Sequence, residues 1–227
     1  MKKNFIGYYP PTDEEINKSW EVGFFAFDTN TLLNLYRYTE STRIDFLKTI
    51  KAIKSRLFLP FQVALEYHDN RRNVIGKQNE AYDNLLNDIE KISLSFDNQI
   101  NQFKKHPSIS IEKIFRMKNK AFKKIKGEIK NQKIGHTNFL EDDLILNEVT
   151  ELFDGKIGDD FSMKELEKIY GEGEDRYNHL IPPGFKDKQK EQRNGMKKRK
   201  IYGDLIIWKE LIKFGQKVKK TYNIYNR

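Results

Sequence analysis

The stretch Val22-Gly-Phe-Phe-Ala-Phe27, followed at once by Asp28-Thr-Asn30, decides the fold of this chain. Its short apolar run ends abruptly at a carboxylate, which is typical of a strand buried on both faces of a parallel sheet. The apolar residues from Leu32 to Tyr36 then predict a helix directly after the strand. Because open α/β sheets bind ligands at the carboxyl ends of their strands, Asp28 stands at a position where a functional group is expected.

Strands and helices continue to alternate after this first pair. Residues 39–54 have the amphipathic pattern of a second helix, and Arg56-Leu-Phe-Leu59 predicts a short second strand that stops at Pro60. Proline suits the first turn of a helix, so a further helix should follow. Its expected inward residues are Val63, Ala64, Tyr67 and Val74. This order of elements predicts a layered α/β domain.

The middle of the chain has a different pattern. Apolar residues recur at three- and four-residue steps on both sides of Pro107, which predicts two long helices at about 77–105 and 109–131. We expect them to form a hairpin inserted into the α/β core. The expected organisation is a first core part at 1–76, the inserted hairpin at 77–135 and a second core part at 136–227.

The second core part is predicted to be mostly helical. One helix is expected over about 138–153, and another begins at Ser162, where Ser-Met-Lys-Glu fits a capping box. Residues 171–196 are rich in glycine, proline and charge, which predicts a long loop. A last helix should follow Tyr202-Gly-Asp204, with Leu205, Trp208, Leu211 and Ile212 on one face.

Composition excludes several classes of protein. The chain of 227 residues has no cysteine, which excludes disulfide scaffolds, zinc–thiolate sites and thiol catalysis. Its 13% aromatic content argues against disorder. The four histidines show no i,i+4 pairing and no glycine-rich phosphate loop is present. The absence of a long apolar stretch or signal peptide predicts a soluble protein of the cytoplasm without membrane contact.

The formal net charge of +9 suits a polyanionic partner, although the richness in Lys, Asn and Ile would also follow from an AT-rich coding sequence. The distribution of charge is more informative. Residues 104–133 hold eleven basic and two acidic residues, 186–200 hold eight and two, whereas 141–175 hold three and thirteen. This segregation favours a directed electrostatic field.

Three carboxylates are candidates for chemistry, each with a simpler alternative. Asp28 has the position of a hard-oxygen metal ligand, but Asp also often caps a helix. Glu66 lies in an apolar helix face, so it needs a partner, either Arg71, Arg72 or a metal. Asp204 opens an apolar helix, and capping explains it as well.

Taken together, these residues lie in three ordered blocks that closely resemble the bacterial PIN-like domain family. The blocks are Phe25-Ala-Phe-Asp28-Thr-Asn30 with its following helix, Leu59-Pro60-Phe-Gln-Val-Ala-Leu-Glu66, and Ile181-Pro-Pro-Gly184-Phe-Lys-Asp187 with Tyr202-Gly-Asp204-Leu-Ile-Ile-Trp208. The resemblance implies a three-layer α/β/α sandwich with a parallel sheet and the long helical hairpin inserted. It also implies a nuclease that uses Mg²⁺ or Mn²⁺ and leaves 5′-phosphate and 3′-hydroxyl ends.

Carried over by motif, the catalytic and metal-binding carboxylates would be Asp28, Glu66 and Asp204. Secondary candidates are Asn30, Asp187 and Arg71. The basic loop next to Asp204 would bind nucleic-acid phosphates, with a solvated loop as the alternative. Its candidate residues are Lys186, Lys188, Lys190, Arg193, Lys197, Lys198, Arg199 and Lys200. The basic hairpin would either extend this track or face a protein partner.

Members of the family normally continue past the Asp204 helix into another strand that ends in Asp, whereas this sequence stops at Thr221 to Arg227. The resemblance therefore implies a missing strand, whose open sheet edge would invite pairing with another chain or a second copy. By analogy, the protein would be a defence or toxin-type effector with a partner such as an ATPase or an inhibitor. The alternatives are a non-catalytic nucleic-acid-binding or scaffolding module and a helical protein–protein adaptor.

Overall fold

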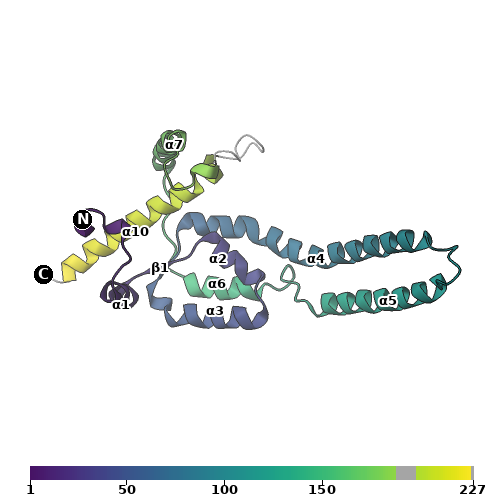
Figure 1. Ribbon diagram of the computed structural model, residues 1–227. Helices are drawn as coiled ribbons and strands as arrows, with labels where there is room; N and C mark the ends of the chain where they lie inside the picture. The colour runs from purple at the N-terminus through teal and green to yellow at the C-terminus, as the bar shows by residue number, and fades with distance from the viewer. Residues whose placement is uncertain (188–197, 226–227) are drawn as a thin grey trace. The chain divides into compact units, whose positions relative to one another are not determined.

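The computed structural model describes residues 1–187 and 198–225 (Figure 1). The chain divides into two compact units. The first comprises Met1–Leu32, Tyr38–His68 and Glu148–Arg227, and the second comprises Leu33–Arg37 and Asp69–Asn147. Helices predominate in both, and a small parallel sheet lies in the first unit.

The sheet of the first unit confirms the predicted parallel pairing. Strand β1 (Phe25–Ala26) pairs with β2 (Leu57–Phe58), and Phe25 lies opposite Leu57. An isolated parallel bridge joins Leu59 to Ile157. The strand expected over 22–27 is shorter than predicted because Val22 still belongs to helix α1 (Asp13–Val22), which a Thr12–Glu15 capping box starts.

Helices follow the strands as the apolar pattern predicts. Helix α2 (Thr29–Leu33) comes directly after β1, and α3 (Glu40–Ala52) and α4 (Phe61–Asn101) flank β2 in the chain. The remaining α-helices are α5 (Ile111–Gly135), α6 (Leu144–Phe153), α7 (Met163–Asn178), α9 (Lys198–Ile201) and α10 (Gly203–Tyr225). Short 3-10 helices are η1 (Lys2–Asn4), η2 (Ile6–Tyr8), η3 (Asn34–Tyr36), η4 (Lys54–Arg56) and η5 (Phe185–Asp187).

The core of the first unit includes residues around the sheet and separate buried clusters near α7 and α10. Around the sheet, the ring of Phe27 packs edge-on against Phe46 of α3 and Phe153 of α6. Residues Val63, Ala64 and Tyr67 of α4 are buried as predicted, and so is Val74 in the second unit. A separate cluster joins α7 to α10 through Phe161, Leu166, Ile169, Leu205 and Ile206.

The buried face of α10 differs from the predicted one. Leu205 and Ile206 are completely buried, whereas Trp208 is 51% exposed and Ile212 is 40% exposed. The reason is that α7 packs against the first turn of α10, where Leu205 and Ile206 form the buried side of the helix. Further along α10, Glu210 is buried.

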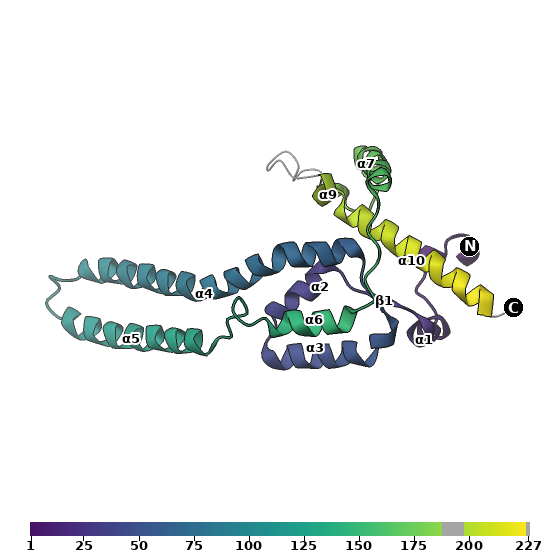
Figure 2. The same cartoon turned by 180° about the vertical axis from the view of Figure 1, so that it is seen from behind.

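The second unit contains the predicted hairpin, in which α4 and α5 lie side by side in both views (Figures 1 and 2). The separate helix expected at 77–105 is wrong in one respect. Helix α4 runs without a break from Phe61, so the hairpin arm continues the helix that carries Glu66. No proline interrupts the sequence between Phe61 and Asn101, which allows the helix to continue.

Three other boundaries differ from the expectations. The capping box at Ser162 and Glu165 is confirmed, but α7 extends to Asn178, so residues 171–178 are helical and not part of a loop. Helix α6 begins at Leu144, later than the expected 138. Helix α10 continues to Tyr225, past the point where a strand was expected to begin.

Some expectations are not tested by this architecture. With two short strands and one bridge among the described residues, the three-layer sandwich stays a prediction, as do the insertion boundaries at 76/77 and 135/136. Within the same described part of the chain, no helix is long and apolar enough to cross a membrane.

Candidate functional site

Asp28 lies at the carboxyl end of β1, as predicted, and its side chain is exposed. Both carboxylate oxygens accept hydrogen bonds from the segment that follows. The backbone N–H of Thr29 donates to Oδ1 at 2.8 Å, and Asn30 Nδ2 donates to Oδ2 at 3.3 Å. Asp28 therefore accepts a hydrogen bond from a backbone N–H at the start of α2. This is the helix-capping role that the sequence offered as the alternative to metal binding. Each carboxylate oxygen carries two lone pairs, so this role leaves acceptor capacity for a ligand.

Glu66 lies on α4 and is partly buried. Its Oε1 accepts from Gln62 Nε2 at 2.8 Å, and its Oε2 accepts from the hydroxyl of Thr29 at 2.9 Å. Arg71, one of the two arginines expected near Glu66, forms an ion pair with Asp143 inside the second unit. The bond from Thr29 thus joins Glu66 to the segment that carries Asp28.

Asp204 lies in the first turn of α10 and is exposed. The backbone of the preceding residue, Gly203, lies close to the side chain of Glu66. A Cβ added to Gly203 would lie 2.6 Å from Glu66 Oε1. On the other side, a Cβ on Gly184 would lie 2.9 Å from Asp204 Cβ and 3.2 Å from its Oδ2. Gly184 also has φ +80°, a backbone conformation that favours glycine. Two glycines therefore allow backbone to approach two of the three carboxylates.

These contacts bring the three predicted acids into one region of the first unit. Asp28 adjoins Thr29, Thr29 binds Glu66, and Glu66 abuts Gly203 next to Asp204. Even so, no three His, Asp or Glu side chains of the described residues are grouped closely enough to hold one metal ion. The donor chemistry fits a hard divalent cation, since all three are carboxylates and the adjoining glycines add no side chain.

Sequence reasoning missed a polar chain behind Glu66. Arg199 Nε donates to Gln62 Oε1 at 2.7 Å, and Gln62 in turn donates to Glu66. Two further bonds of 2.7 and 3.1 Å join the guanidinium of Arg199 to Asp160, and the bond to Asp160 raises the pKa of Arg199. Only the position of Gln62, four residues before Glu66 on one helix, could have signalled this arrangement.

Glu210 on α10 is the other buried acid that the sequence did not single out. It is 3% exposed, and its Oε2 accepts the backbone N–H of Gln62 at 3.2 Å. Its buried Oε1 has no hydrogen-bond partner within the described part of the chain. Burial raises the pKa of Glu210 to about 7. Gln62 thus binds Glu210 through its backbone N–H and Glu66 through its side chain. The pKa of Glu210 lies well above that of an ordinary glutamate.

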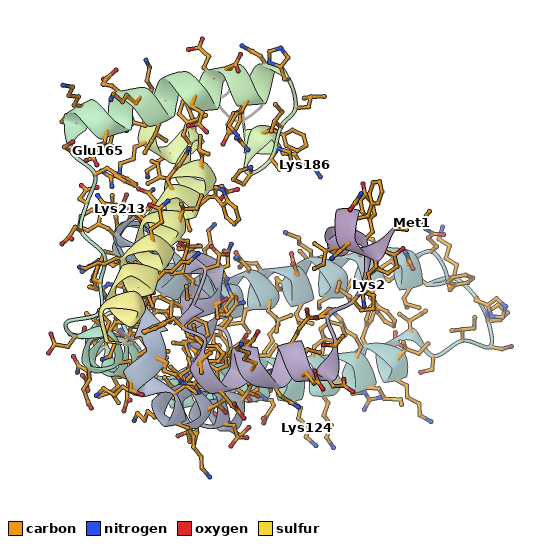
Figure 3. All side chains as sticks on the ribbon, turned by 90° about the vertical axis from the view of Figure 1, so that its left-hand side faces the viewer. Met1, Lys2, Lys124, Glu165, Lys186 and Lys213 are labelled. Carbon is orange, nitrogen blue, oxygen red and sulfur yellow. The ribbon has the colours of Figure 1, made fainter. Side chains whose placement is uncertain are left out.

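The predicted basic loop is described only in part. Lys186, Lys198 and Lys200 are exposed, and Figure 3 shows Lys186 beyond the end of α7 opposite to Glu165. Arg199 is engaged by Asp160 and Gln62. Asp187 ends η5, whereas four of the predicted phosphate-binding residues lie outside the described residues, namely Lys188, Lys190, Arg193 and Lys197.

Comparison with known proteins identifies the family of the chain. The model of a family described as PIN like domain matches residues 24–223, which include all three acids. No curated protein and no solved structure matches the chain. PIN-like domains are generally nucleases that act on nucleic acid and typically use divalent metals.

Proposed function

Because the chain belongs to the PIN-like domain family, we propose that it is a divalent-metal-dependent nuclease that hydrolyses phosphodiester bonds of RNA or DNA. The observation that carries the proposal is the contact chain from Thr29 through Glu66 to Gly203, since it connects three segments far apart in sequence. We also infer that β1, β2 and the Leu59–Ile157 bridge belong to a larger parallel sheet between two helical layers.

In this proposal, Asp28, Glu66 and Asp204 hold Mg²⁺ or Mn²⁺ as carboxylate ligands. Both ions prefer oxygen donors, and Mg²⁺ usually keeps several waters, which leaves positions for phosphate oxygens. The bound cation would activate the attacking water and offset charge on the phosphate. Cleavage would leave 5′-phosphate and 3′-hydroxyl ends. A further acid, Asp187, would stand at the rim of the site.

The neighbouring side chains would orient the ligands. The hydroxyl of Thr29 and the amide of Gln62 each hold one oxygen of Glu66, and Asn30 holds one oxygen of Asp28. Carboxylates fixed in this way lose less conformational freedom when they bind a cation. Arg71 has no part in this arrangement, because its charge is paired with Asp143.

Lys186, Lys198 and Lys200 would supply salt-sensitive contacts to phosphates near the site, together with the predicted Lys188, Lys190, Arg193 and Lys197. Arg199 would act differently, as a positioning residue, since it is bound to Gln62 and Asp160. A cytoplasmic defence or toxin-type role, and a partner such as an ATPase, inhibitor or second copy, rest on family analogy alone.

One observation favours a second candidate function. The lack of a three-ligand group among the described residues would suit a non-catalytic nucleic-acid-binding module that keeps the fold but not the metal. Such a module would bind nucleic acid equally well with EDTA and with Mn²⁺, and it would not cleave.

The test uses the full chain with end-labelled single- and double-stranded RNA and DNA, with Mn²⁺, Mg²⁺ or EDTA. The nuclease proposal expects cleavage with a metal, and its loss by at least about 100-fold in Asp28→Asn, Glu66→Gln and Asp204→Asn. Asp45→Asn, a carboxylate on α3 that lies outside this contact chain, is the matched control. Binding without cleavage in every metal, with all four variants equal, would establish the binding module instead.

A metal-binding measurement separates the two candidates without relying on activity. Under the nuclease proposal, Mn²⁺ raises the melting temperature of the wild type and of Asp45→Asn, but much less that of Asp28→Asn. An equal shift in all three proteins would mean that the ion binds elsewhere.

A further inference from the structure

One face of α5 carries six basic side chains, which we call the basic row: Lys113, Arg116, Lys120, Lys123, Lys124 and Lys130. Successive members are 3, 4, 3, 1 and 6 residues apart, and at 3.6 residues per turn all six fall within about one third of the helix circumference. All six side chains are exposed. None of them forms an ion pair with any acidic residue that the structure describes.

The direction of this face is fixed by the opposite face of α5. Three other lysines of the helix bind acids of α4: Lys118 Nζ lies 2.8 Å from Asp97, Lys126 binds Glu90, and Lys133 Nζ lies 2.6 Å from Asp83. These pairs run in opposite directions along the two helices, as an antiparallel hairpin requires.

Apolar burial on the inner face agrees with this orientation. Ile111 and Ile129 of α5 are buried on the same side as Lys118, since 7- and 11-residue spacings repeat a helix face. Figure 3 shows Lys124 on the side of α5 that faces away from α4. The basic row is therefore held outward, and it is not free to turn toward the acids of the hairpin.

We propose that the basic row is a binding surface for the phosphate backbone of nucleic acid. From Lys113 to Lys130 the row covers 17 helical steps, or about 26 Å at the rise of an α-helix. That length corresponds to roughly seven or eight nucleotides at the axial spacing of one strand. Unpaired cations in a straight row match a line of phosphates, whose bound counterions they would release.

The chemistry of α5 argues against an anionic membrane as the partner. A helix that lies on a membrane inserts a continuous apolar face beside its basic face. In α5 the apolar side with Ile111 and Ile129 is already buried in the hairpin. The exposed apolar residues Met117, Ile125 and Ile134 lie too far apart along the helix to form such a strip.

This surface adds to the proposed function without depending on it. The basic row would supply sequence-independent affinity, whereas the carboxylates of the first unit would supply chemistry. A protein that binds through the row but does not cleave would refute the nuclease proposal alone. If removal of the basic row changes neither binding nor cleavage, this inference alone is refuted.

The test compares two triple variants of the full chain. Lys113→Gln, Lys120→Gln and Lys124→Gln remove three charges of the row. The control Lys18→Gln, Lys48→Gln and Lys168→Gln removes three exposed charges from α1, α3 and α7, none of which has an ion-pair partner among the described residues. Binding to fluorescein-labelled RNA and DNA oligonucleotides is measured by anisotropy from 50 to 300 mM salt. EDTA is present throughout, because it removes divalent metal and so prevents cleavage.

The row variant should bind at least about tenfold more weakly at low salt. The negative slope of log K against log salt should become shallower by about 2 to 3. The control should change affinity by less than about twofold. Equal losses in both variants would mean that only net charge matters and would overturn the proposal.

Two further measurements keep the result decisive. Circular dichroism at 222 nm should be unchanged in the row variant, because its three side chains are exposed. Acetylation of the lysines in the wild type, read by mass spectrometry, should fall at the row when oligonucleotide is bound. Protection by anionic vesicles and not by oligonucleotide would assign the surface to a membrane and overturn the inference.

Discussion

The hydroxyl of Thr29 donates a hydrogen bond of 2.9 Å to Oε2 of Glu66, across 37 positions of the sequence. Thr29 is buried, and its backbone N–H binds the side chain of Asp28 at the same time. One residue therefore fixes two of the three proposed ligands relative to each other. Its role was not apparent from the sequence, where a threonine after Asp28 suggests only the start of a helix.

Replacing this hydroxyl should impair activity more than folding. Thr29→Val keeps the size of the side chain and removes the donor, so we expect activity to fall about 10- to 100-fold, as for other partners of metal-binding carboxylates. The free energy of unfolding should fall by about 1 to 2 kcal/mol. Thr29→Ser should restore most of the activity, as measured by cleavage rates with Mn²⁺. Full activity in Thr29→Val would show that the bond does not matter.

Adding one methyl group at Gly203 should disturb Glu66, because the new Cβ would lie 2.6 Å from Oε1. We expect Gly203→Ala to lose activity and Mn²⁺ binding. Gly215→Ala is the matched control on the same helix, since a Cβ there would meet no described residue within 4 Å. That control should keep activity and gain about 1 kcal/mol of stability. Similar behaviour of the two variants would contradict the close approach.

The raised pKa of Glu210 predicts a particular pH dependence of stability. Between its unfolded value of 4.5 and its folded value of about 7, the folded state binds more protons than the unfolded state. The stability of the first unit should therefore fall as pH rises through this window, by up to about 3 kcal/mol. Asp160 strengthens the shift, whereas Arg199, Lys213 and the Gln62 N–H oppose it.

Glu210→Gln should remove this contribution, so the variant should gain on the wild type as pH rises from 5 to 8. Both tryptophans, Trp20 and Trp208, lie in the first unit, so fluorescence in urea titrations reports its unfolding. A difference between variant and wild type that stays constant with pH would show that Glu210 titrates normally.

In the hairpin, the two partners of one ion pair should differ in importance. Lys118 has a side chain only 5% exposed and pairs with Asp97, which is 34% exposed. Asp97→Ala would leave a buried unpaired ammonium and should cost about 2 kcal/mol or more, whereas Lys118→Met removes the charge and should cost less. The exposed pair partner Asp83→Ala should cost at most about 1 kcal/mol. Helix melting at 222 nm checks the order.

Much of the fold could be predicted because local patterns determine it. The strand before Asp28, the helix after Pro60 and the capping box at Ser162 follow from apolar periodicity and cap chemistry. Element lengths were less predictable. The pattern over 22–27 does not show that α1 extends to Val22, and glycine in residues 171–178 obscured the end of α7.

The candidate site could be predicted only as a set of separate residues. Asp28, Glu66 and Asp204 stand out by position and motif, and sequence alone left each with a capping or ion-pair alternative. Residues such as Gln62 and Arg199, whose contacts span 137 positions, have no local signature. The sequence likewise did not show that Leu205 and Ile206, and not Trp208, are buried against α7.

The sequence by itself determined which segments are strands or helices, where charge accumulates, and that Asp28, Glu66 and Asp204 are candidate site residues. These properties depend on neighbours within a few residues, so they can be read along the chain. Only the tertiary structure decided that Thr29 and Gly203 both meet Glu66, that Arg71 binds Asp143, and that Glu210 is buried. Those contacts join distant residues, and their energies exist only once packing has excluded water around them.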